Sequence, residues 1–296
     1  MAHLESDPEF QDYLGAFREG LQKLGWTEGR NIQIDVRWGA LDDAEGRQQS
    51  AKELVALRPD LIVTQNTPPT AAMLQQTGAI PVVFVIVADP VGSAFVQSLP
   101  HPGGNATGFT IMEPTIVSKW LELLKEIAPH VTRAAILFNP ATTPYANIYV
   151  TPFKTAAPSF GLEATTAIVH DKVELETAIA AQARDSSGGL IVMPDGFLNV
   201  HRADLVSLAA SHRIPAVYPW RFFTEQGGLL SYGSEMRDEF RLAAEYADRI
   251  LKGEKPADLP VQAPTKYELV INLRTAKTLG LNVSQQFQLL ADKVIE

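Results

Sequence analysis

Apolar stretches that suit buried strands alternate with stretches of helical periodicity along most of the chain. From residue 8 to residue 24 the apolar positions recur at three- and four-residue spacing, which predicts an amphipathic helix. Asp7 and Pro8 suit the start of this helix, and Gly25 suits its end. Residues 81–87 form a continuous apolar run, which is typical of a strand covered on both sheet faces.

The same reasoning predicts further strands and helices as far as residue 280. The predicted strands cover residues 32–36, 60–64, 81–87, 108–111, 133–138, 163–169, 189–193, 215–218, 229–232 and 268–271. The predicted helices cover residues 44–57, 68–77, 90–99, 115–127, 145–160, 173–184, 200–211, 235–251 and 274–279. This alternation favours an α/β fold with parallel sheets.

Two strand–helix–strand stretches resemble each other, and in both the second strand follows an Ile-Pro pair, at 80–81 and 214–215. This similarity and a Gly-rich break at 102–108 favour two Rossmann-like lobes with a boundary near residues 111–115. We expect lobe one to comprise 1–112 and 230–262, and lobe two to comprise 113–229 and 263–296. A single (β/α)₈ barrel also suits this length and is the competing architecture.

Composition excludes several classes of protein. With 46% hydrophobic and 20% charged residues in 296, the chain has the balance of a soluble globule, and the longest strongly apolar stretch, 82–88, is too short to cross a bilayer. A net charge of −9 without polybasic runs argues against nucleic acid as a partner. The N-terminal residues have no features of a signal peptide. We therefore expect a cytosolic protein or a mature or trimmed secreted chain; the absence of cysteine fits both.

The search for catalytic chemistry is negative. Without cysteine the chain can have neither a Cys nucleophile nor Cys ligands for zinc or iron–sulfur clusters. It contains no dinucleotide fingerprint, phosphate loop, zinc-protease motif or nucleophile elbow. The histidines are scattered, so we expect His170, His201 and His212 to bind no metal and to do no acid–base work. No metal and no cofactor are predicted.

Polar residues followed by proline recur at the carboxyl ends of predicted strands, as at Thr67, Asp89 and Asn139. In open parallel sheets these ends line a crevice where ligands bind, and helix N-termini there suit a carboxylate. Helix capping alone also explains Thr67 and Asp89. Tyrosines occupy related positions and can cover an apolar ligand while their hydroxyls stay hydrogen-bonded; they are Tyr145, Tyr218 and Tyr232. Asp195 could pair with a ligand ammonium or cap the next turn.

Five stretches in this order resemble the ABC-transporter substrate-binding proteins of the tryptophan/tyrosine type, and together they extend over almost the whole chain. They read FREGLQKLGWTEG (17–29), ADPVG (88–92), PGGNATG (102–108), GGLLSYG (227–233) and KPADLPVQAPTKYELVINLRTAKTLGL (255–281). The resemblance implies the periplasmic-binding-protein-like I fold, with parallel sheets and a ligand cleft between two lobes joined by three crossovers. It also implies a permease and an ATPase in the membrane as partners, a periplasmic or other extracytoplasmic location, and no enzyme activity.

Ligands of the resembling family are amino acids, notably aromatic ones, so we expect a small ligand, an amino acid or an aromatic carboxylate, captured by a monomer through lobe closure. Lobe one would hold the carboxylate with Asn66, Thr67 and the backbone around Ala88 and Asp89, and lobe two would supply Asn139, Tyr145, Asp195 and Tyr218. The family also has an apolar first strand before its first ligand loop, here the loop of Ser6. Only four residues precede Glu5, so we expect much of that strand to lie outside this sequence.

Two other functions remain open at this point. One is a ligand-sensing domain of a receptor or regulator with the same fold, although no helix-turn-helix precedes the first helix. The other is a βα enzyme, which would need a nucleophile or metal site that the sequence does not contain.

Overall fold

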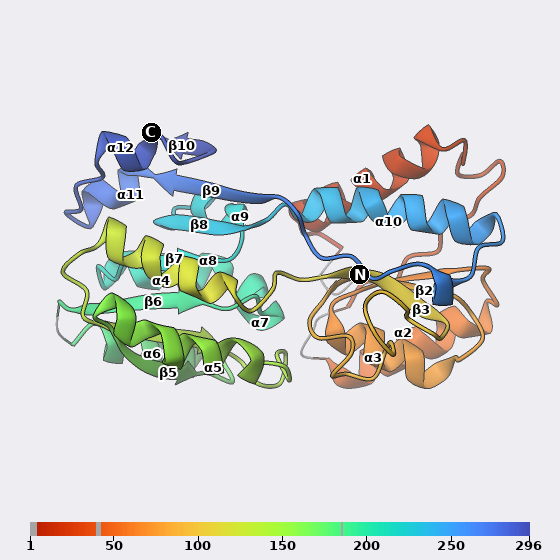
Figure 1. Ribbon diagram of the computed structural model, residues 1–296, viewed down its shortest axis with the longest axis horizontal. Helices are drawn as coiled ribbons and strands as arrows, with labels where there is room; N and C mark the ends of the chain where they lie inside the picture. Colours follow the sequence, from red (N-terminus) through yellow and green to blue (C-terminus); the bar gives the residue numbers. More distant parts are fainter. Residues whose placement is uncertain (1–4, 40–42, 185) are drawn as a thin grey trace. The chain divides into compact units, whose positions relative to one another are not determined.

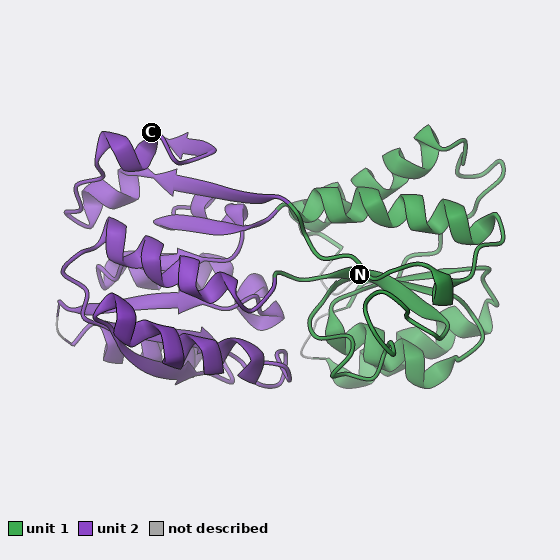
Figure 2. Ribbon diagram, viewed as in Figure 1, with its two compact units in different colours: residues 1–112, 235–265 green, residues 113–234, 266–296 purple. Residues whose placement is uncertain are grey.

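The computed structural model describes residues 5–39, 43–184 and 186–296. The chain forms two compact units, one of residues 1–112 and 235–265 and the other of residues 113–234 and 266–296 (Figure 2). It therefore passes between the units after residues 112, 234 and 265. Each unit has its own sheet, so the single (β/α)₈ barrel is wrong.

The three-stranded sheet of unit 1 is parallel and has the order β1 (Ile62–Gln65), β2 (Val82–Val87), β3 (Ala106–Thr110). Helices α1 (Pro8–Lys23) and α10 (Met236–Leu251) cover one face, and α2 (Ala44–Ala56) and α3 (Thr67–Gln76) cover the other (Figure 1). The N-terminal helix begins where the sequence predicts, because the Asp7 side chain accepts a hydrogen bond from the Glu9 N–H at 3.2 Å and caps it.

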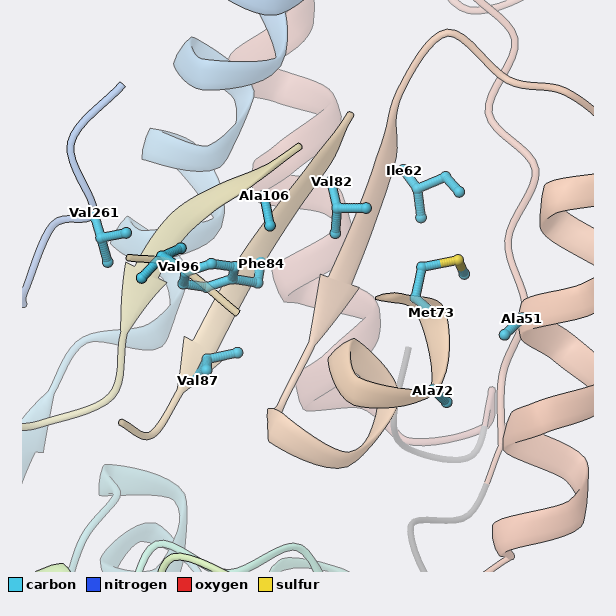
Figure 3. Close-up of a cluster of buried hydrophobic side chains, with 10 residues drawn as sticks. All are labelled: Ala51, Ile62, Ala72, Met73, Val82, Phe84, Val87, Val96, Ala106 and Val261. Atoms are coloured by element: carbon cyan, nitrogen blue, oxygen red, sulfur yellow. The ribbon is translucent and has the colours of Figure 1, made fainter. Parts of the chain in front are cut away.

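Apolar side chains from the strands meet those of α2 and α3 in the core of unit 1 (Figure 3). The cluster comprises Ala51, Ile62, Ala72, Met73, Val82, Phe84, Val87, Val96, Ala106 and Val261. All six residues of β2 are buried, as the continuous apolar run at 81–87 predicts. Burying this surface anchors the strand ends from which the loops of unit 1 project.

The first and last helical segments of unit 1 pack closely on each other. The Tyr13 and Phe240 rings stack with centroids 5.7 Å apart, and the Trp26 indole N–H donates to the Asp248 carboxylate at 2.9 Å. A Cβ at Gly20 would lie 2.7 Å from the Cβ of Ala244, so only glycine allows this approach. Helix α10 therefore completes a unit that α1 begins, although unit 2 separates them in the sequence.

Unit 2 contains a seven-stranded sheet of order β10-β9-β8-β7-β6-β4-β5. Its strands are β4 (Arg133–Phe138), β5 (Glu163–Ile168), β6 (Gly188–Val192), β7 (Ala216–Tyr218), β8 (Leu230–Ser234), β9 (Tyr267–Asn272) and β10 (Lys293–Ile295). All neighbours are parallel except β8 and β9. Its helices are α4 (Ile116–Ile127), α5 (Asn147–Ala156), α6 (Lys172–Gln182), α7 (Gly196–Val200), α8 (Arg202–Ser211), α9 (Arg221–Glu225), α11 (Leu273–Thr278) and α12 (Gln285–Gln288).

Three sequence predictions are wrong within the described residues. Residues 90–99 form turns, not a helix: Ala94 has a φ of 57°, and the Phe95 N–H donates to the Pro90 carbonyl, five residues earlier, at 2.9 Å. Residues 32–36 form no strand, and Ile32 makes only an isolated bridge with Glu28. Strand β8, assigned to lobe one from residue 230, pairs with β7 and β9 in unit 2 before the chain crosses back. In the described part of the chain, no helix combines the length and apolarity needed to span a membrane.

Candidate functional site

The order of the strands in unit 2 changes direction between β4 and β6. Strand β5 pairs on one side of β4, whereas β6, β7 and β8 follow on the other side. At such a switch point the loops after the two central strands diverge, leaving a crevice outside their carboxyl ends, where ligands bind in open α/β sheets. Asn139 follows β4 and Asp195 follows β6, so both lie at this point.

The Asp195 carboxylate joins the two loops at the switch point. Its Oδ2 accepts from the Asn139 backbone N–H at 2.5 Å, and its Oδ1 accepts from the Thr142 hydroxyl at 2.6 Å. Oδ1 also accepts from the Phe197 N–H at 2.7 Å and the Leu198 N–H at 3.4 Å at the start of α7. Asp195 is 1% exposed, so the carboxylate that links the two loops is buried beneath them.

Burial raises the pKa of Asp195 to about 6, even though the hydrogen bonds from Thr142, Asn139, Phe197 and Leu198 all favour the charged form. Desolvation is therefore the dominant effect on this carboxyl. At neutral pH the group is ionised and its oxygens are occupied by four donors. This arrangement suits a positioning role better than a direct ion pair with a ligand.

Tyr145 presents its ring beside these loops. Its hydroxyl donates to the Pro194 carbonyl at 2.9 Å, and its ring meets the Tyr149 ring edge-on with centroids 6.4 Å apart. The residue is half-buried. Burial, and secondly the Asp195 charge, raises the pKa of the Tyr145 hydroxyl, so it remains a donor. The hydroxyl bond to the Pro194 carbonyl fixes the orientation of the Tyr145 ring, and such a ring can pack on the apolar part of a ligand.

The other two tyrosines of the predicted site, Tyr218 and Tyr232, lie elsewhere in unit 2. Tyr218 is 1% exposed and stacks on Phe223 with centroids 5.0 Å apart, as expected of a core residue, and burial raises the pKa of its hydroxyl. Tyr232 lies in β8 and stacks on Tyr267 of β9 with centroids 5.7 Å apart. The structure therefore brings together Asn139, Tyr145 and Asp195, while these two tyrosines pack against other rings.

In unit 1 the loops after β1 and β2 meet through a single hydroxyl. The Thr67 Oγ1 accepts from the Ala88 N–H at 3.0 Å. Both residues are buried, whereas Asn66 is half-buried and Asp89 is exposed. Thr67 is the first residue of α3, and the prolines at 68 and 69 have no N–H. Among residues 67–69, only Thr67 therefore has a backbone N–H that could bind an anion. A helix without these prolines would offer more donors, so the expected carboxylate site is weaker at this helix start.

The backbone of these unit 1 loops is strained. Asn66 has a φ of 72° and a ψ of 159°, a region that is nearly restricted to glycine. Ile86 has a φ of 60° where the pairing of β2 with β3 shifts register, and Asp89 has a φ of 42°. A β-branched residue with a positive φ is a true outlier. Strain of this kind concentrates at binding sites, which favours a ligand role for this edge.

Ser6 lies in the turn before α1 and is exposed. Among the described residues, Ser6 makes no hydrogen bond to the loops after β1 and β2. Thr142 is a residue that the sequence analysis missed. It bonds to a carboxylate 53 residues away, so only the strand order β4-β6 could have revealed it.

Comparisons with known proteins give the family. The family model described as ABC transporter substrate binding protein matches residues 2–295, so the chain belongs to this family. It is 27% identical over 282 residues to a tyrosine-binding protein of Clostridioides difficile (strain R20291), covering 95% of this chain and 80% of the relative. The function of the family is substrate binding, not catalysis.

Solved structures support the same fold. An ABC domain from Streptococcus pneumonia in complex with L-Trp is 26% identical with a TM-score of 0.90, covering 98% of this chain and 96% of that chain. The ligand-free, open structure of a substrate binding protein with adhesive properties from Clostridium difficile is 25% identical with a TM-score of 0.73, covering 99% and 97%. The two α/β units are thus the two lobes of the periplasmic-binding-protein type I fold.

Proposed function

We propose that this protein captures an aromatic amino acid outside the cytoplasmic membrane and delivers it to the permease and ATPase of an ABC importer. The observation that carries the ligand class is its match, along nearly its whole length, to a protein named for tyrosine binding and to a domain solved with L-Trp. Family membership supports the transport partners and the extracytoplasmic location.

Both units contribute to binding in this proposal. In unit 1, the N–H of Thr67 and the backbone of the Ala88–Asp89 loop hold the ligand carboxylate. In unit 2, Tyr145 covers the aromatic body, and Asp195 keeps the Asn139 loop in position for polar contacts with the ammonium. This division is supported by the strained backbone at the first edge and by the hydrogen-bonded switch point at the second.

Calorimetric titration tests the ligand class. We expect L-tyrosine and L-tryptophan to bind, and tyramine, which lacks the carboxylate, to bind at least tenfold more weakly. L-Leucine, which lacks the ring, is the matched control for the aromatic surface. If none of the aromatic amino acids binds, while a thermal-shift screen over purines and aromatic acids finds another ligand, the assigned ligand class is wrong.

Variants at Thr67 test the carboxylate site. Thr67→Ala removes the acceptor for the Ala88 N–H, and we expect binding to weaken by about 1–3 kcal/mol. Thr67→Ser keeps the hydroxyl and should bind nearly as wild type. Thr155→Ala is the matched control, because the Thr155 hydroxyl only donates to a carbonyl of its own helix. Equal affinities for Thr67→Ala and Thr155→Ala would refute this role.

We further propose that ligand binding favours a closed arrangement of the lobes. A relative has been solved in a ligand-free, open form, which supports an equilibrium of this kind in the family. A ligand can shift such an equilibrium only by its difference in affinity for the two forms. Small-angle scattering with and without L-tyrosine tests this step, and an unchanged radius of gyration at saturation would contradict it.

A further inference from the structure

Strand β5 forms one edge of the seven-stranded sheet of unit 2 (Figure 1). It pairs with β4 over six residues without a shift in register. The N–H groups of Glu163 and Val169 donate to carbonyls of the chain around β4, so the odd-numbered residues of β5 bond to that neighbour. In a parallel pair the alternate residues direct both backbone groups to the other side. The residues of β5 that do so are Ala164, Thr166 and Ile168.

Bonds within the chain limit this outward edge at both ends. Before it, the Leu162 N–H donates to the Ala157 carbonyl at 3.1 Å. After it, the His170 N–H donates to the Glu174 carboxylate at 2.9 Å, and the His170 carbonyl accepts from the Asn139 amide at 3.3 Å. In the described parts of the chain, the three outward residues between these ends have no backbone partner. The edge that can bind a strand is thus symmetric about its central threonine.

The β5 edge also lacks the features that prevent strand pairing. Natural edge strands are protected by lysine, proline or a bulge. Strand β5 contains neither lysine nor proline, its pairing with β4 has no bulge, and its one charged residue is the first. Thr166 is exposed, and Ile168 is 50% exposed. A groove of about 420 Å³ between β5 and α6 is lined by small side chains, among them Thr165, Ala167 and Ala178. Bulky side chains therefore do not block a second strand on that face.

The partner that fits these three residues is a second copy of the same strand. Two copies related by a two-fold axis pair antiparallel, which closes the assembly at a dimer. With Thr166 opposite its own copy, Ala164 lies opposite Ile168 of the second copy, so a small side chain meets a large one and no like charges face each other. The next register would place Ala164 opposite His170, whose backbone groups are already bonded. Only the register centred on Thr166 uses all three outward residues.

We propose that this protein forms a two-fold dimer in which the β5 strands of two copies pair antiparallel about Thr166. The dimer replaces the monomer expected from the family resemblance, and it does not depend on the identity of the ligand. Six residues of strand extend over about 20 Å, and a sheet with one helix layer is about 20 Å high, so the contact buries roughly 800 Å² in total. This area is small for a permanent complex, so we expect a reversible dimer with a dissociation constant above about 10 μM.

Sedimentation equilibrium of the full chain between about 10 μM and about 1 mM tests the association. We expect the average mass of the wild type to rise towards that of a dimer. Thr166→Pro removes the central outward N–H without removing a bond to β4, and we expect the dissociation constant to rise at least tenfold. Thr166→Val keeps the N–H and the side-chain shape and should associate as the wild type does. A wild type that stays monomeric, or equal association of the two variants, would overturn the proposal.

A cysteine variant tests the register without disrupting the strand. The chain contains no cysteine, so Thr166→Cys introduces a single thiol. In a hydrogen-bonded antiparallel pair the Cα atoms are about 5.5 Å apart, which a disulfide can bridge. With oxidised glutathione as the oxidant, we expect Thr166→Cys to form disulfide-linked dimers at least tenfold faster than Ser211→Cys. The Ser211 position, at the end of α8, is also exposed but lies outside the proposed contact. Equal rates of dimer formation would overturn the proposal.

Discussion

The carboxyl edges of the two sheets are held in different ways. In unit 2 four hydrogen bonds from two loops and a helix start converge on one buried carboxylate, Asp195. In unit 1 the loops carry positive φ angles at Asn66, Ile86 and Asp89, and one Thr67 hydroxyl links them. We infer that the loops of unit 2 are already held in one conformation. In unit 1, a change of backbone conformation would relieve strain.

Removing the carboxylate of unit 2 should have the largest effect. Asp195→Ala leaves two backbone loops and the Thr142 hydroxyl without their acceptor in a buried place, so we expect the free energy of unfolding to fall by about 3–5 kcal/mol. Urea denaturation measures it. Asp204→Ala, which removes an exposed partner of Lys172, should cost at most about 1 kcal/mol. Similar losses for both variants would contradict the role of Asp195.

Stability should depend on pH through the same group. The pKa of Asp195 in the folded protein is about 6, above the value near 3.9 of an unfolded chain, so the folded state binds more protons between these values. Its contribution is therefore fully present below about pH 4 and is lost as the pH rises through 6.

Asp195→Asn cannot ionise, so its stability relative to wild type should rise by about 2 kcal/mol from pH 4 to pH 7. Urea unfolding of both proteins at several pH values measures this difference. A difference that stays constant with pH would show that Asp195 titrates alike in the folded and unfolded states.

In unit 1 a substitution at the strained loop should raise the free energy of unfolding instead of lowering it. Asn66→Gly relieves a backbone conformation that glycine tolerates, and we expect a gain of about 1 kcal/mol in the free energy of unfolding. Asn66→Ala keeps the strain and should give no gain. Urea denaturation distinguishes them, and a loss of stability in Asn66→Gly would mean that its side chain contributes more than the strain costs.

The smallest change is expected for Asp89→Asn. Asn tolerates the left-handed φ of 42° and keeps an acceptor for the Gly92 N–H, so Asp89→Asn should change stability by less than about 0.5 kcal/mol. Asp89→Ala loses both advantages and should cost about 1–2 kcal/mol. Thermal unfolding of Asp89→Asn and Asp89→Ala measures the difference. Equal melting temperatures would show that neither the Gly92 N–H bond nor the positive φ explains the acidic residue at this position.

Local signals explain which elements the sequence could predict. The helix from Pro8 was predictable because Asp7, Pro8 and the apolar spacing all lie within its own segment. The predicted helix at 90–99 fails because Ala94 adopts a positive φ, which breaks the helical backbone and cannot be read from periodicity. The apolar residues at 32, 34 and 36 are half-buried and those between them are exposed, as in a strand. A strand also needs a hydrogen-bonded neighbouring strand, which the sequence pattern does not reveal.

The candidate site shows the same limit. Polar residues before prolines at Thr67, Asp89 and Asn139 can be found by reading along the chain. The bond between Thr142 and Asp195 cannot, because the order of β4 and β6 in the sheet brings them together. Tyr218 shows the converse, since a strand-end position does not reveal that its ring turns into the core onto Phe223.

The packing of α1 on α10 also determines the order in which the protein can fold. The bond from Trp26 to Asp248 joins residues 222 apart, so it cannot form until the ribosome has completed most of unit 2. In contrast, the chain stays within unit 2 from β4 to β8, so these strands can pair as they emerge from the ribosome. Contacts between distant residues form slowly because a long loop must close first. The N-terminal third of the chain is therefore an unfinished unit for most of its synthesis, and chaperones can bind it during that time.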